Sequence, residues 1–360
     1  MKRLLEPAAL HALARGCGVL GAGGGGETYL TLLQALQASE DYGPVSLVDV
    51  DELPDDALIM PCGGIGATTV SIEKFENGDE GDRLRDHLQF LTGRPVAALM
   101  AGEIGGGNGM LPITWAARLG LPLVDADGMG RAFPEVPQVT MQLAGISPMP
   151  AVMTDERGNL VVFQAISGDW MERLERAAAV EFGGAASSTE FSLTAAQART
   201  ATIRNSVSLA IRIGEAISQA RHSPVAALIA ELGAFRLVSG KVSDVERHTT
   251  SGFVRGSVVI EGLGEDAGRL IRLELQNENL VALERGRVLA SVPDLISVLD
   301  IETADAIGTE RIRYGQRVVV IAFGCAPVWR TEGGLALTGP RAFGYDFDYL
   351  PVEELAGASS

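Results

Sequence analysis

The stretch PVAALMAGEIGGGNG, residues 95–109, contains the pattern that decides the fold: an apolar run, a glycine-rich loop, and then residues with helical spacing. The stretches 56–70 (DALIMPCGGIGATTV) and 121–135 (LPLVDADGMGRAFPE) likewise run from an apolar segment into a glycine-rich or polar loop. This order predicts an α/β domain with a parallel sheet. In such a sheet the strand ends gather at one edge, where ligands bind.

Length and composition indicate a compact protein of two domains that binds a small molecule. The chain has 360 residues, 46% hydrophobic and 21% charged. That length exceeds one ordinary core, and that balance is typical of folded proteins. The formal net charge of −17 argues against nucleic acid or an anionic membrane surface as a partner. We expect a small-molecule ligand. We also expect a homo-oligomer, because most oligomers of soluble proteins are symmetric assemblies of one chain.

The chain start and the cysteines favour a cytoplasmic location. Residues 1–17 have a basic tip followed by leucines, but Glu6 and Pro7 interrupt the apolar run. We therefore expect an amphipathic helix there rather than a secretion signal. No segment reaches the roughly 20 uninterrupted apolar residues of a membrane span. Cys17, Cys62 and Cys325 lie far apart without a CxxC pair, which predicts neither a disulfide framework nor a cysteine zinc site.

The hydrophobic pattern changes after about residue 150 and predicts three segments. A hairpin is expected around residues 155–159, and a single long helix is expected over residues 193–223 with Thr194 as its N-cap. Short alternating runs then indicate a β-sandwich or a barrel-like sheet. The expected organisation is an α/β domain with glycine-rich ligand loops, a helical segment packed on it, and a β-rich C-terminal domain, at residues 1–165, 166–233 and 234–360.

A run of four glycines lies within residues 18–30, GVLGAGGGGETYL. A dinucleotide fingerprint would follow a strand, but the preceding residues have a helical pattern, and Glu27 stands where a phosphate-binding loop would need lysine. What remains is a nest of backbone N–H groups at a helix N-terminus, able to hold a carbonyl oxygen or a developing negative charge. A purely structural turn is the alternative. The candidate ligand residues are Gly23, Gly24, Gly25 and Gly26.

Several carboxylates follow the predicted strands. Glu103 could serve as a general base or a metal ligand, or it could cap a neighbouring helix; Asn108 lies beyond the three glycines that follow it. The next loop brings further charged residues to the same predicted edge: Asp125, Asp127, Arg131 and Glu135. Such a group can hold a divalent cation, raise one carboxyl pKa for acid–base work, or form a structural ion network. The sequence leaves these open, and Glu103, Asp125 and Asp127 are the metal candidates.

Two further residues are candidates with structural alternatives. Cys62 is the cysteine next to a predicted strand end, where a thiolate could act as a nucleophile, although free cysteine is commonly just buried. Glu73 precedes Lys74 after the second glycine loop. That pair is either part of a ligand site or an ordinary solvated pair.

Seven motifs follow one another along the chain: LGAGGGGETY, GGIGATTVSIEK, GEIGGGNG, DADGMGRAFPE, GFVRG, VPDLI and GPRAFGYD. In this order they resemble the motifs of the S-methyl thiohydantoin desulfurase-like family, long catalogued as a domain of unknown function and associated with hydantoin utilisation. The resemblance implies a two-domain fold, α/β and then β-rich, and covers nearly the whole chain. The matching residues are Gly23 to Gly26, Glu73, Glu103, Asn108, Asp125, Asp127, Arg131 and Glu135.

The favoured hypothesis is a hydrolase or desulfurase that attacks a ring carbon of a hydantoin-like substrate with water or a thiolate. Glu103 or Asp127 would be the base, Arg131 would orient the ring, and the glycine amides would stabilise negative charge. Whether a divalent cation takes part stays open. The alternative is a non-catalytic subunit or ligand-binding partner of a hydantoinase-type complex. A third hypothesis is a nucleotide-dependent enzyme. The missing lysine of a phosphate-binding loop counts against it.

Overall fold

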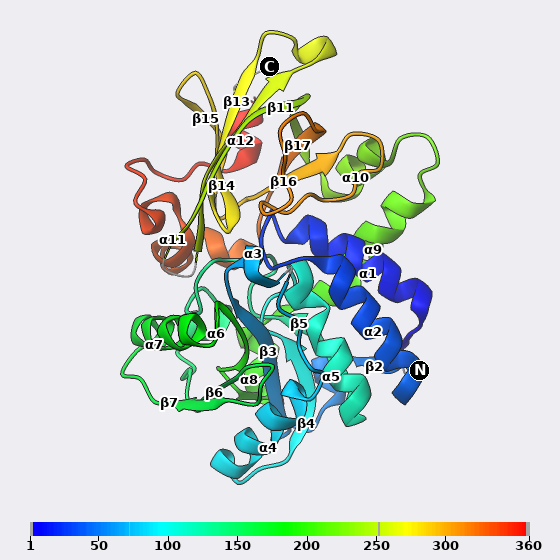
Figure 1. Ribbon diagram of the computed structural model, residues 1–360, viewed down its shortest axis with the longest axis vertical. Helices are drawn as coiled ribbons and strands as arrows, with labels where there is room; N and C mark the ends of the chain where they lie inside the picture. The colour runs from blue at the N-terminus through cyan, green and yellow to red at the C-terminus, as the bar shows by residue number, and fades with distance from the viewer. Residues whose placement is uncertain (1–2, 72, 251–252, 358–360) are drawn as a thin grey trace.

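The computed structural model describes residues 3–71, 73–250 and 253–357 (Figure 1). The N-terminal domain is built on a sheet in the order β1-β2-β5-β4-β3. Strands β2, β5, β4 and β3 are parallel, and β1 is antiparallel to β2. The strands are mostly buried apolar runs, as parallel strands covered on both faces require. Their bounds are Arg3–Leu5 (β1), Val45–Val48 (β2), Leu58–Gly66 (β3), Val96–Ala101 (β4) and Leu123–Asp127 (β5).

Strand β3 changes partner along its length. Its first half, Leu58–Cys62, pairs with β4, and its last four residues, Gly63–Gly66, pair antiparallel with β8 (Ala185–Thr189). The hairpin of β6 (Ala151–Thr154) and β7 (Leu160–Phe163) continues the sheet beyond β8, which confirms the hairpin predicted around residues 155–159. The change of partner therefore falls at the carboxyl end of the parallel strands, beside the loops that follow β4 and β5.

Helices α1 (Pro7–Leu20), α2 (Thr28–Tyr42) and α9 (Ser206–Gln219) lie side by side against the N-terminal sheet (Figure 1). Two glycines let the backbones of α1 and α9 touch. A Cβ on Gly16 would lie 1.8 Å from the carbonyl oxygen of Ala210, and one on Gly214 would lie 1.9 Å from that of Ala12. The other helices of this half are α3 (Thr68–Ser71), α4 (Glu80–Thr92), α5 (Leu111–Leu119), α6 (Thr140–Leu143), α7 (Gly168–Glu181), α8 (Ala195–Ala201) and α10 (Pro224–Leu232).

The single long helix expected over residues 193–223 is wrong in its middle. Thr194 does cap a helix, α8, in a capping box with Gln197. The chain then forms the short strand β10 (Ile203–Arg204), which pairs with β5, and Asn205 takes a left-handed φ of 63° before α9 begins. Strand pairing and the left-handed residue override the helical pattern there. The segment 166–233 therefore adds strands β8, β9 (Leu193–Thr194) and β10 to the N-terminal sheet.

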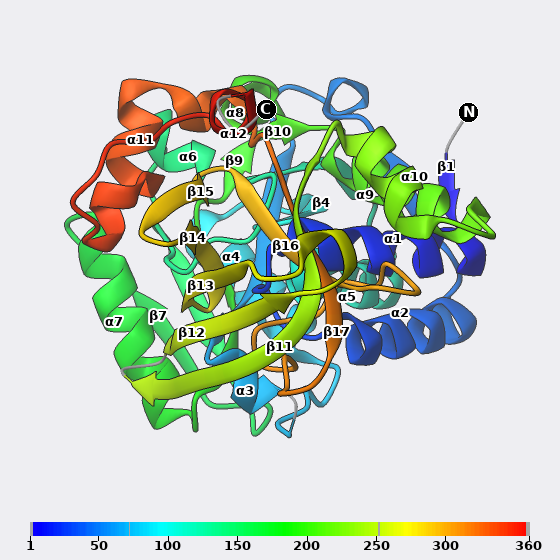
Figure 2. The ribbon, with the colours of Figure 1, turned by 90° about the horizontal axis from the view of Figure 1, so that it is seen from above.

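The C-terminal region is one antiparallel sheet in the order β15-β14-β13-β12-β11-β17-β16. It curls so that its two ends meet: the side-chain amide of Asn279 on β14 donates to the carbonyl oxygen of Ile296 on β16 over 2.9 Å (Figure 2). The predicted fold class, an α/β domain followed by a β-rich domain, is confirmed, and the β-rich part is the barrel-like alternative. Its strands are β11 (Phe235–Thr250), β12 (Phe253–Gly262), β13 (Leu270–Gln276), β14 (Glu278–Glu284), β15 (Arg287–Ser291), β16 (Leu295–Asp300) and β17 (Arg317–Phe323).

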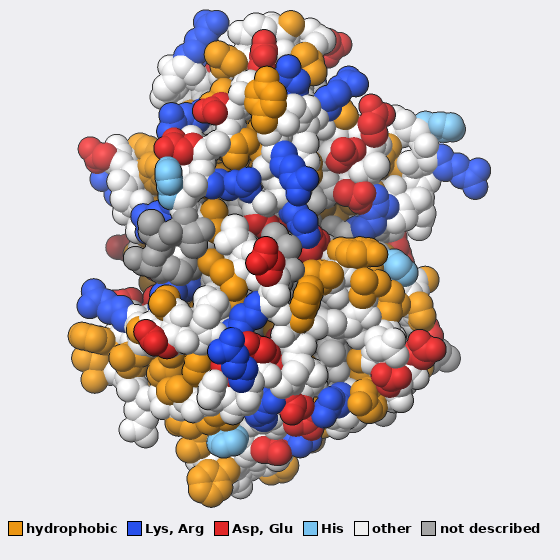
Figure 3. Space-filling model, in the orientation of Figure 1, with side chains coloured by type: hydrophobic (Ala, Val, Ile, Leu, Met, Phe, Trp, Pro, Cys, Tyr) orange, Lys and Arg blue, Asp and Glu red, His pale blue; other side chains and the backbone are white. Residues whose placement is uncertain are grey.

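Two helices, α11 (Glu332–Thr338) and α12 (Val352–Gly357), follow this sheet. The first residue of the GFVRG motif, residue 252, lies outside the described residues. On the face drawn in Figure 3, acidic and basic side chains are interspersed, and hydrophobic side chains gather over α7 and β7, where Ile166 and Trp170 are exposed. Among the described helices, none combines the length and the apolar character that crossing a membrane demands.

Candidate functional site

A cavity of about 210 Å³ lies at the carboxyl edge of the parallel strands. Its walls come from the glycine run before α2, from β3, and from the loops after β4 and β5. Strand β8 and the start of β14 close the remaining sides. The glycine-rich loops predicted to converge on one edge thus line one cavity, and both halves of the chain contribute to it.

The glycine run offers amide groups to this cavity. Gly25 and Gly26 line it with φ values of 74° and 85°, and a Cβ on Gly25 would lie 2.1 Å from the carbonyl oxygen of Gly105. Their carbonyl oxygens accept from the N–H groups of Asn108 (3.0 Å) and Gly107 (2.9 Å). Their own N–H groups donate to no atom of the described chain. Two backbone donors are therefore available to a ligand.

The other two glycines of the run do not line the cavity. Gly23 lies under the side chain of Asn279, which a Cβ would approach to 2.7 Å. Gly24 donates its N–H to Gly21 and packs against the side chain of Glu278. Both glycines serve the contact with the C-terminal sheet, so the predicted four-residue ligand loop reduces to its second half.

Glu103 follows β4 and lines the cavity with only 7% of its surface exposed. One carboxyl oxygen accepts from the side-chain amide of Asn108 and the other from the N–H of Phe133 (3.2 Å). Burial raises the pKa of Glu103 to about 8, against the lowering effect of these two donors. The carboxyl is therefore poised to gain or lose a proton near neutral pH.

Asn108 connects Glu103 to two other walls of the cavity. Its side-chain oxygen accepts from the N–H of Gly64 (2.9 Å), and its side-chain amide also donates to the carbonyl oxygen of Gly64 (3.1 Å). Its backbone N–H is held by Gly25. The three glycine-rich loops are thus fixed to one another through the side chain and the backbone of this residue.

Glu278 is a cavity residue that the sequence analysis missed. It begins β14, is 2% exposed, and its Oε2 has no hydrogen-bond partner in the described part of the chain. Burial, followed by the charge of Glu103, raises its pKa well above the ordinary range. The run QNEN at residues 276–279, four consecutive polar residues among strands that otherwise alternate polar and apolar residues, is the signal that could have found it.

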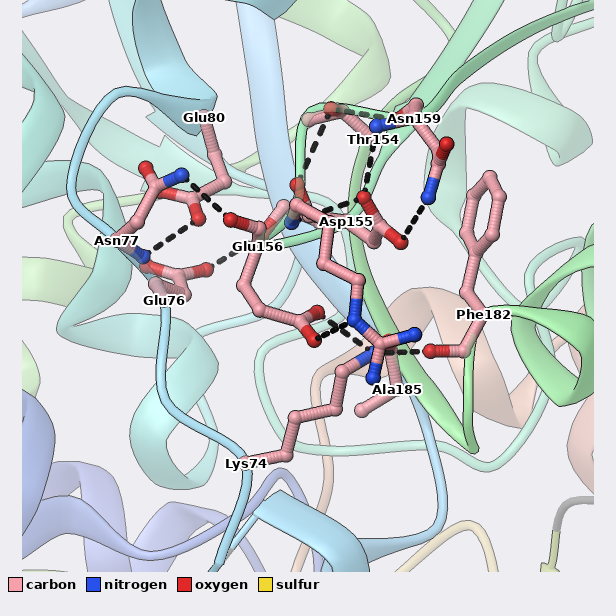
Figure 4. A network of polar contacts seen from close by, with 12 residues as sticks. Lys74, Glu76, Asn77, Glu80, Thr154, Asp155, Glu156, Asn159, Phe182 and Ala185 are labelled. Atoms are coloured by element: carbon pink, nitrogen blue, oxygen red, sulfur yellow. Dashed lines mark hydrogen bonds and ion pairs between the residues drawn. The ribbon is translucent and has the colours of Figure 1, made fainter.

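The far end of the cavity holds a network of charged side chains (Figure 4). The ammonium group of Lys74 donates to the carbonyl oxygens of Phe182 and Ala185 and pairs with Glu156 at 2.9 Å. Nearby, Glu76 accepts from the hydroxyl of Ser187, and burial and then the charge of Glu80 raise its pKa to about 8. Lys74 is thus fully engaged with protein atoms.

Arg176, on α7, is likewise engaged. It pairs with Glu172 at 2.8 Å, donates to the carbonyl oxygen of Pro134, and lies over the ring of Phe253. Acidic side chains outnumber basic ones in the lining as described: the acids are Glu27, Glu76, Glu80, Glu103, Glu135, Asp155, Glu156, Glu190 and Glu278, and the bases are Lys74 and Arg176. Burial keeps several of these acids protonated near neutral pH, but both bases are already paired, so the cavity favours neutral or cationic ligands over anionic ones.

Asp127 and Arg131, predicted as a base and a ligand-orienting residue, do not line the cavity, so the structure does not bring them together with Glu103 in it. One oxygen of Asp127 accepts from three backbone N–H groups, those of Ile104, Met129 and Gly130, at 2.7 to 3.0 Å, so this carboxyl shapes the loop after β5. Arg131 is fully buried. Its guanidinium donates to the carbonyl oxygens of Ala132, Pro293 and Asp294. Its contacts join the two domains rather than orient a ligand.

The metal candidates are held by separate partners. Asp125 accepts from the backbone and hydroxyl of Ser208 on α9, Asp127 shapes its own loop, and Glu103 lines the cavity. No group of three or more His, Cys, Asp or Glu residues that could hold a metal ion occurs among the residues described. The geometry therefore gives no support to a divalent-cation site formed by Glu103, Asp125 and Asp127.

Cys62 and Glu73 also lie outside the cavity, whereas Glu135 lines it. Cys62 is 1% exposed in the hydrophobic core, and burial raises its thiol pKa well above the ordinary range, so the thiolate needed for attack is disfavoured. Glu73 is exposed, while Lys74 lines the cavity and pairs with Glu156, so the two do not form the solvated pair that was the alternative. Glu135 is half-buried, and burial followed by the charge of Glu172 raises its pKa.

The fold and the cavity define a two-domain protein whose acidic cavity lies between an α/β domain and a curled β-sheet. Residues 8–165 match the model of the S-Me-THD-like N-terminal domain, and residues 166–352 match that of the S-Me-THD-like C-terminal domain. The chain belongs to the S-Me-THD-like family.

The chain is also similar to the crystal structure of a protein from Chromobacterium violaceum. The TM-score is 0.81 at 24% sequence identity, over 97% of this chain and 100% of the other. At that identity the likeness concerns the fold alone. No curated protein matches the chain in sequence.

Proposed function

We propose that the protein is a hydrolase of the desulfurase type that acts on a small hydantoin-like ring, such as an S-methyl thiohydantoin. The observation that carries the proposal is Glu103, a carboxyl whose pKa is raised to about 8 and which lines a cavity of about 210 Å³ together with the amides of Gly25 and Gly26. Membership of the S-Me-THD-like family supports the class of ring.

Glu103 is the base in this reaction. Its carboxylate takes a proton from water, and the water oxygen bonds to the ring carbon that lies between two nitrogens and carries the methylthio group. Water is the nucleophile because the thiol of Cys62 is buried away from the cavity. The carbon–sulfur bond then breaks, and methanethiol and the hydantoin are the products.

The amides of Gly25 and Gly26 stabilise the negative charge that develops on the ring. They have no hydrogen-bond acceptor in the described chain, and they are fixed by the bonds of their own carbonyl groups to Gly107 and Asn108. Fixed donors of this kind typically contribute about 10²- to 10³-fold in rate each. Loss of that fixation is expected to slow turnover more than it weakens binding.

The charge of the cavity counts against a nucleotide-dependent enzyme. Lys74 and Arg176 are the cations of the described lining, and both are engaged by carboxylates and carbonyl oxygens. A triphosphate would meet an acidic wall without a free counter-charge. A calorimetric titration with ATP is expected to give no binding heat.

Release of methanethiol tests the proposal. Purified protein is incubated with S-methyl thiohydantoins bearing different ring substituents, and the released thiol is measured with a thiol-specific reagent. Glu103→Gln is expected to lower turnover by about 10²- to 10⁴-fold, whereas Glu246→Gln, an exposed carboxyl paired with His248 on β11, leaves it unchanged. Binding without thiol release in the unmodified protein would refute catalysis and favour the non-catalytic alternative.

A further inference from the structure

Glu278 is held in the cavity by unusually firm backbone contacts. The preceding residue, Asn277, has a left-handed φ of 56°, donates its backbone N–H to Val254 (2.7 Å) and accepts the N–H of Val254 on its side chain (2.9 Å). The following residue, Asn279, donates its backbone N–H to the carbonyl oxygen of Ala22 over 2.8 Å. The residues on both sides of Glu278 therefore fix it to the C-terminal sheet and to the chain just before the glycine run.

Gly24 leaves the space that Glu278 occupies. A Cβ on Gly24 would lie 1.9 Å from Oε1 of Glu278, so a side chain there would displace the carboxyl. Gly25 and Gly26, which follow directly, line the same cavity with amides that have no acceptor in the described chain. The carboxyl of Glu278 thus borders the amide donors of the proposed site.

The charges around Glu278 fit one ionised and one protonated carboxyl in the cavity. The charge of Glu103 raises the proton affinity of Glu278, while Arg131 and Arg176 oppose this effect. Arg176 is paired with Glu172, and the guanidinium of Arg131 is buried and held by carbonyl oxygens. Arg131 can therefore balance one ionised carboxyl but not two. As pH rises through the pKa of Glu103, about 8, the cavity holds Glu103 as a base and Glu278 as an acid.

We propose that Glu278 is the second functional carboxyl of the cavity, and that with Glu103 it clamps the N–C–N edge of a neutral or cationic ring and protonates the departing methanethiolate. This inference rests on the proposed function. A carboxylate accepts a hydrogen bond and a carboxylic acid donates one, which matches a ring edge with one N–H and one acceptor nitrogen. Such an edge flanks the reacting carbon of an S-methyl thiohydantoin.

Glu103 and Glu278 together supply and accept all the protons that the reaction moves. Glu103 takes a proton from water as the carbon–oxygen bond forms, and Glu278 gives its proton to sulfur as the carbon–sulfur bond breaks. The hydroxylated ring carbon then tautomerises to the carbonyl of the hydantoin. Loss of a proton from Glu103 to water and uptake of one by Glu278 restore the starting pair, so no further reactant is needed.

A binding experiment tests the clamp without depending on turnover. The probe is 2-aminoimidazol-4-one, a ring in which an amino group replaces the methylthio group, and its affinity is measured by calorimetry. We expect Glu278→Leu, which can neither donate nor accept, to weaken binding by about tenfold or more, because the ring nitrogen loses its buried donor. Glu284→Leu, on the same strand and paired with Arg269 outside the cavity, is the matched control. Equal affinity in the Glu278→Leu variant and the unmodified protein would overturn the clamp.

Turnover tests the proton transfer separately. The pH profile of kcat/KM for thiol release is expected to be bell-shaped in the unmodified protein, because one carboxyl must be ionised and the other protonated. Glu278→Gln is expected to lower kcat and remove the alkaline limb, and an unchanged profile would overturn the acid role. If the unmodified protein releases no thiol, the proposed function and this acid role both fail, while the probe-binding result still decides whether Glu278 belongs to a ligand site.

Discussion

Asn108 shows how one side chain can set the chemistry of another. It donates to Glu103, bonds to both backbone groups of Gly64, and holds Gly25 through its backbone. Its amide lowers the pKa of Glu103, against the larger raising effect of burial. Asn108 is therefore a positioning residue for the base, and it also keeps the pKa of the base near neutrality.

Replacing Asn108 by leucine, which is similar in size but cannot donate, is expected to shift the acidic limb of the pH–rate profile to higher pH. The shift follows because the ionised form of Glu103 loses a donor. The kcat should fall more than KM rises, because the alignment of the base is lost. Gln37→Leu, at an exposed position of α2 where the amide donates to Asp41 away from the lining, serves as the control. A profile that keeps its midpoint in the Asn108→Leu variant would contradict this role.

At the scale of elements, the contact between α1 and α9 holds the start of the glycine run in place. Helix α1 ends at Leu20, just before the run, and Gly16 lies against the carbonyl oxygen of Ala210 in α9. Backbone atoms cannot move aside as a flexible side chain can. The tight crossing therefore depends on the absence of a side chain at Gly16.

Gly16→Ala is expected to destabilise the protein by about 1–3 kcal/mol through overpacking. Gly18→Ala, on the same helix, meets only an ordinary contact of 3.4 Å with Ala306. It should be neutral or slightly stabilising, because alanine favours helix over glycine. Chemical denaturation of the two variants provides the comparison, and equal stabilities would show that the helices are not in backbone contact.

The local patterns that predicted the fold also explain where prediction failed. Strands and their glycine loops are contiguous in sequence, so the carboxyl-edge rule could place Glu103 and Asn108 in one region. It could not distinguish the cavity side of the loop after β5 from its buried side, so it grouped Asp127 and Arg131 with Glu103 although neither lines the cavity. Glu278 comes from the distant C-terminal sheet. The break at Asn205 depends on pairing between β10 and β5, which helical spacing does not reveal.

For the whole molecule, buried carboxyls make stability depend on pH. Burial raises the pKa of Glu76 and Glu103 to about 8 and that of Glu190 to about 7, from an ordinary value of 4.5. Between the ordinary pKa of 4.5 and these raised values, the folded chain keeps protons that the unfolded chain releases. Stability is therefore full below the ordinary pKa and falls as pH rises through the raised values.

The melting temperature is accordingly expected to fall between about pH 5 and pH 9 and to level off above the raised pKa values. Glu76→Gln, which keeps the shape of the side chain without its charge, should flatten this dependence. Calorimetric melting curves across the pH range measure both effects. A melting temperature that rises over this interval would contradict the assignment of these carboxyls as protonated in the folded chain.

The central claim is that Glu103 is the base for displacement at a ring carbon, and the pH dependence of methanethiol release tests it most directly. We expect kcat/KM for an S-methyl thiohydantoin to rise with pH along a limb centred at about 8, the raised pKa of Glu103. In Glu103→Gln this limb should disappear and the rate should be very low at every pH. Thiol release by Glu103→Gln at the unmodified rate, with the same pH limb, would contradict it.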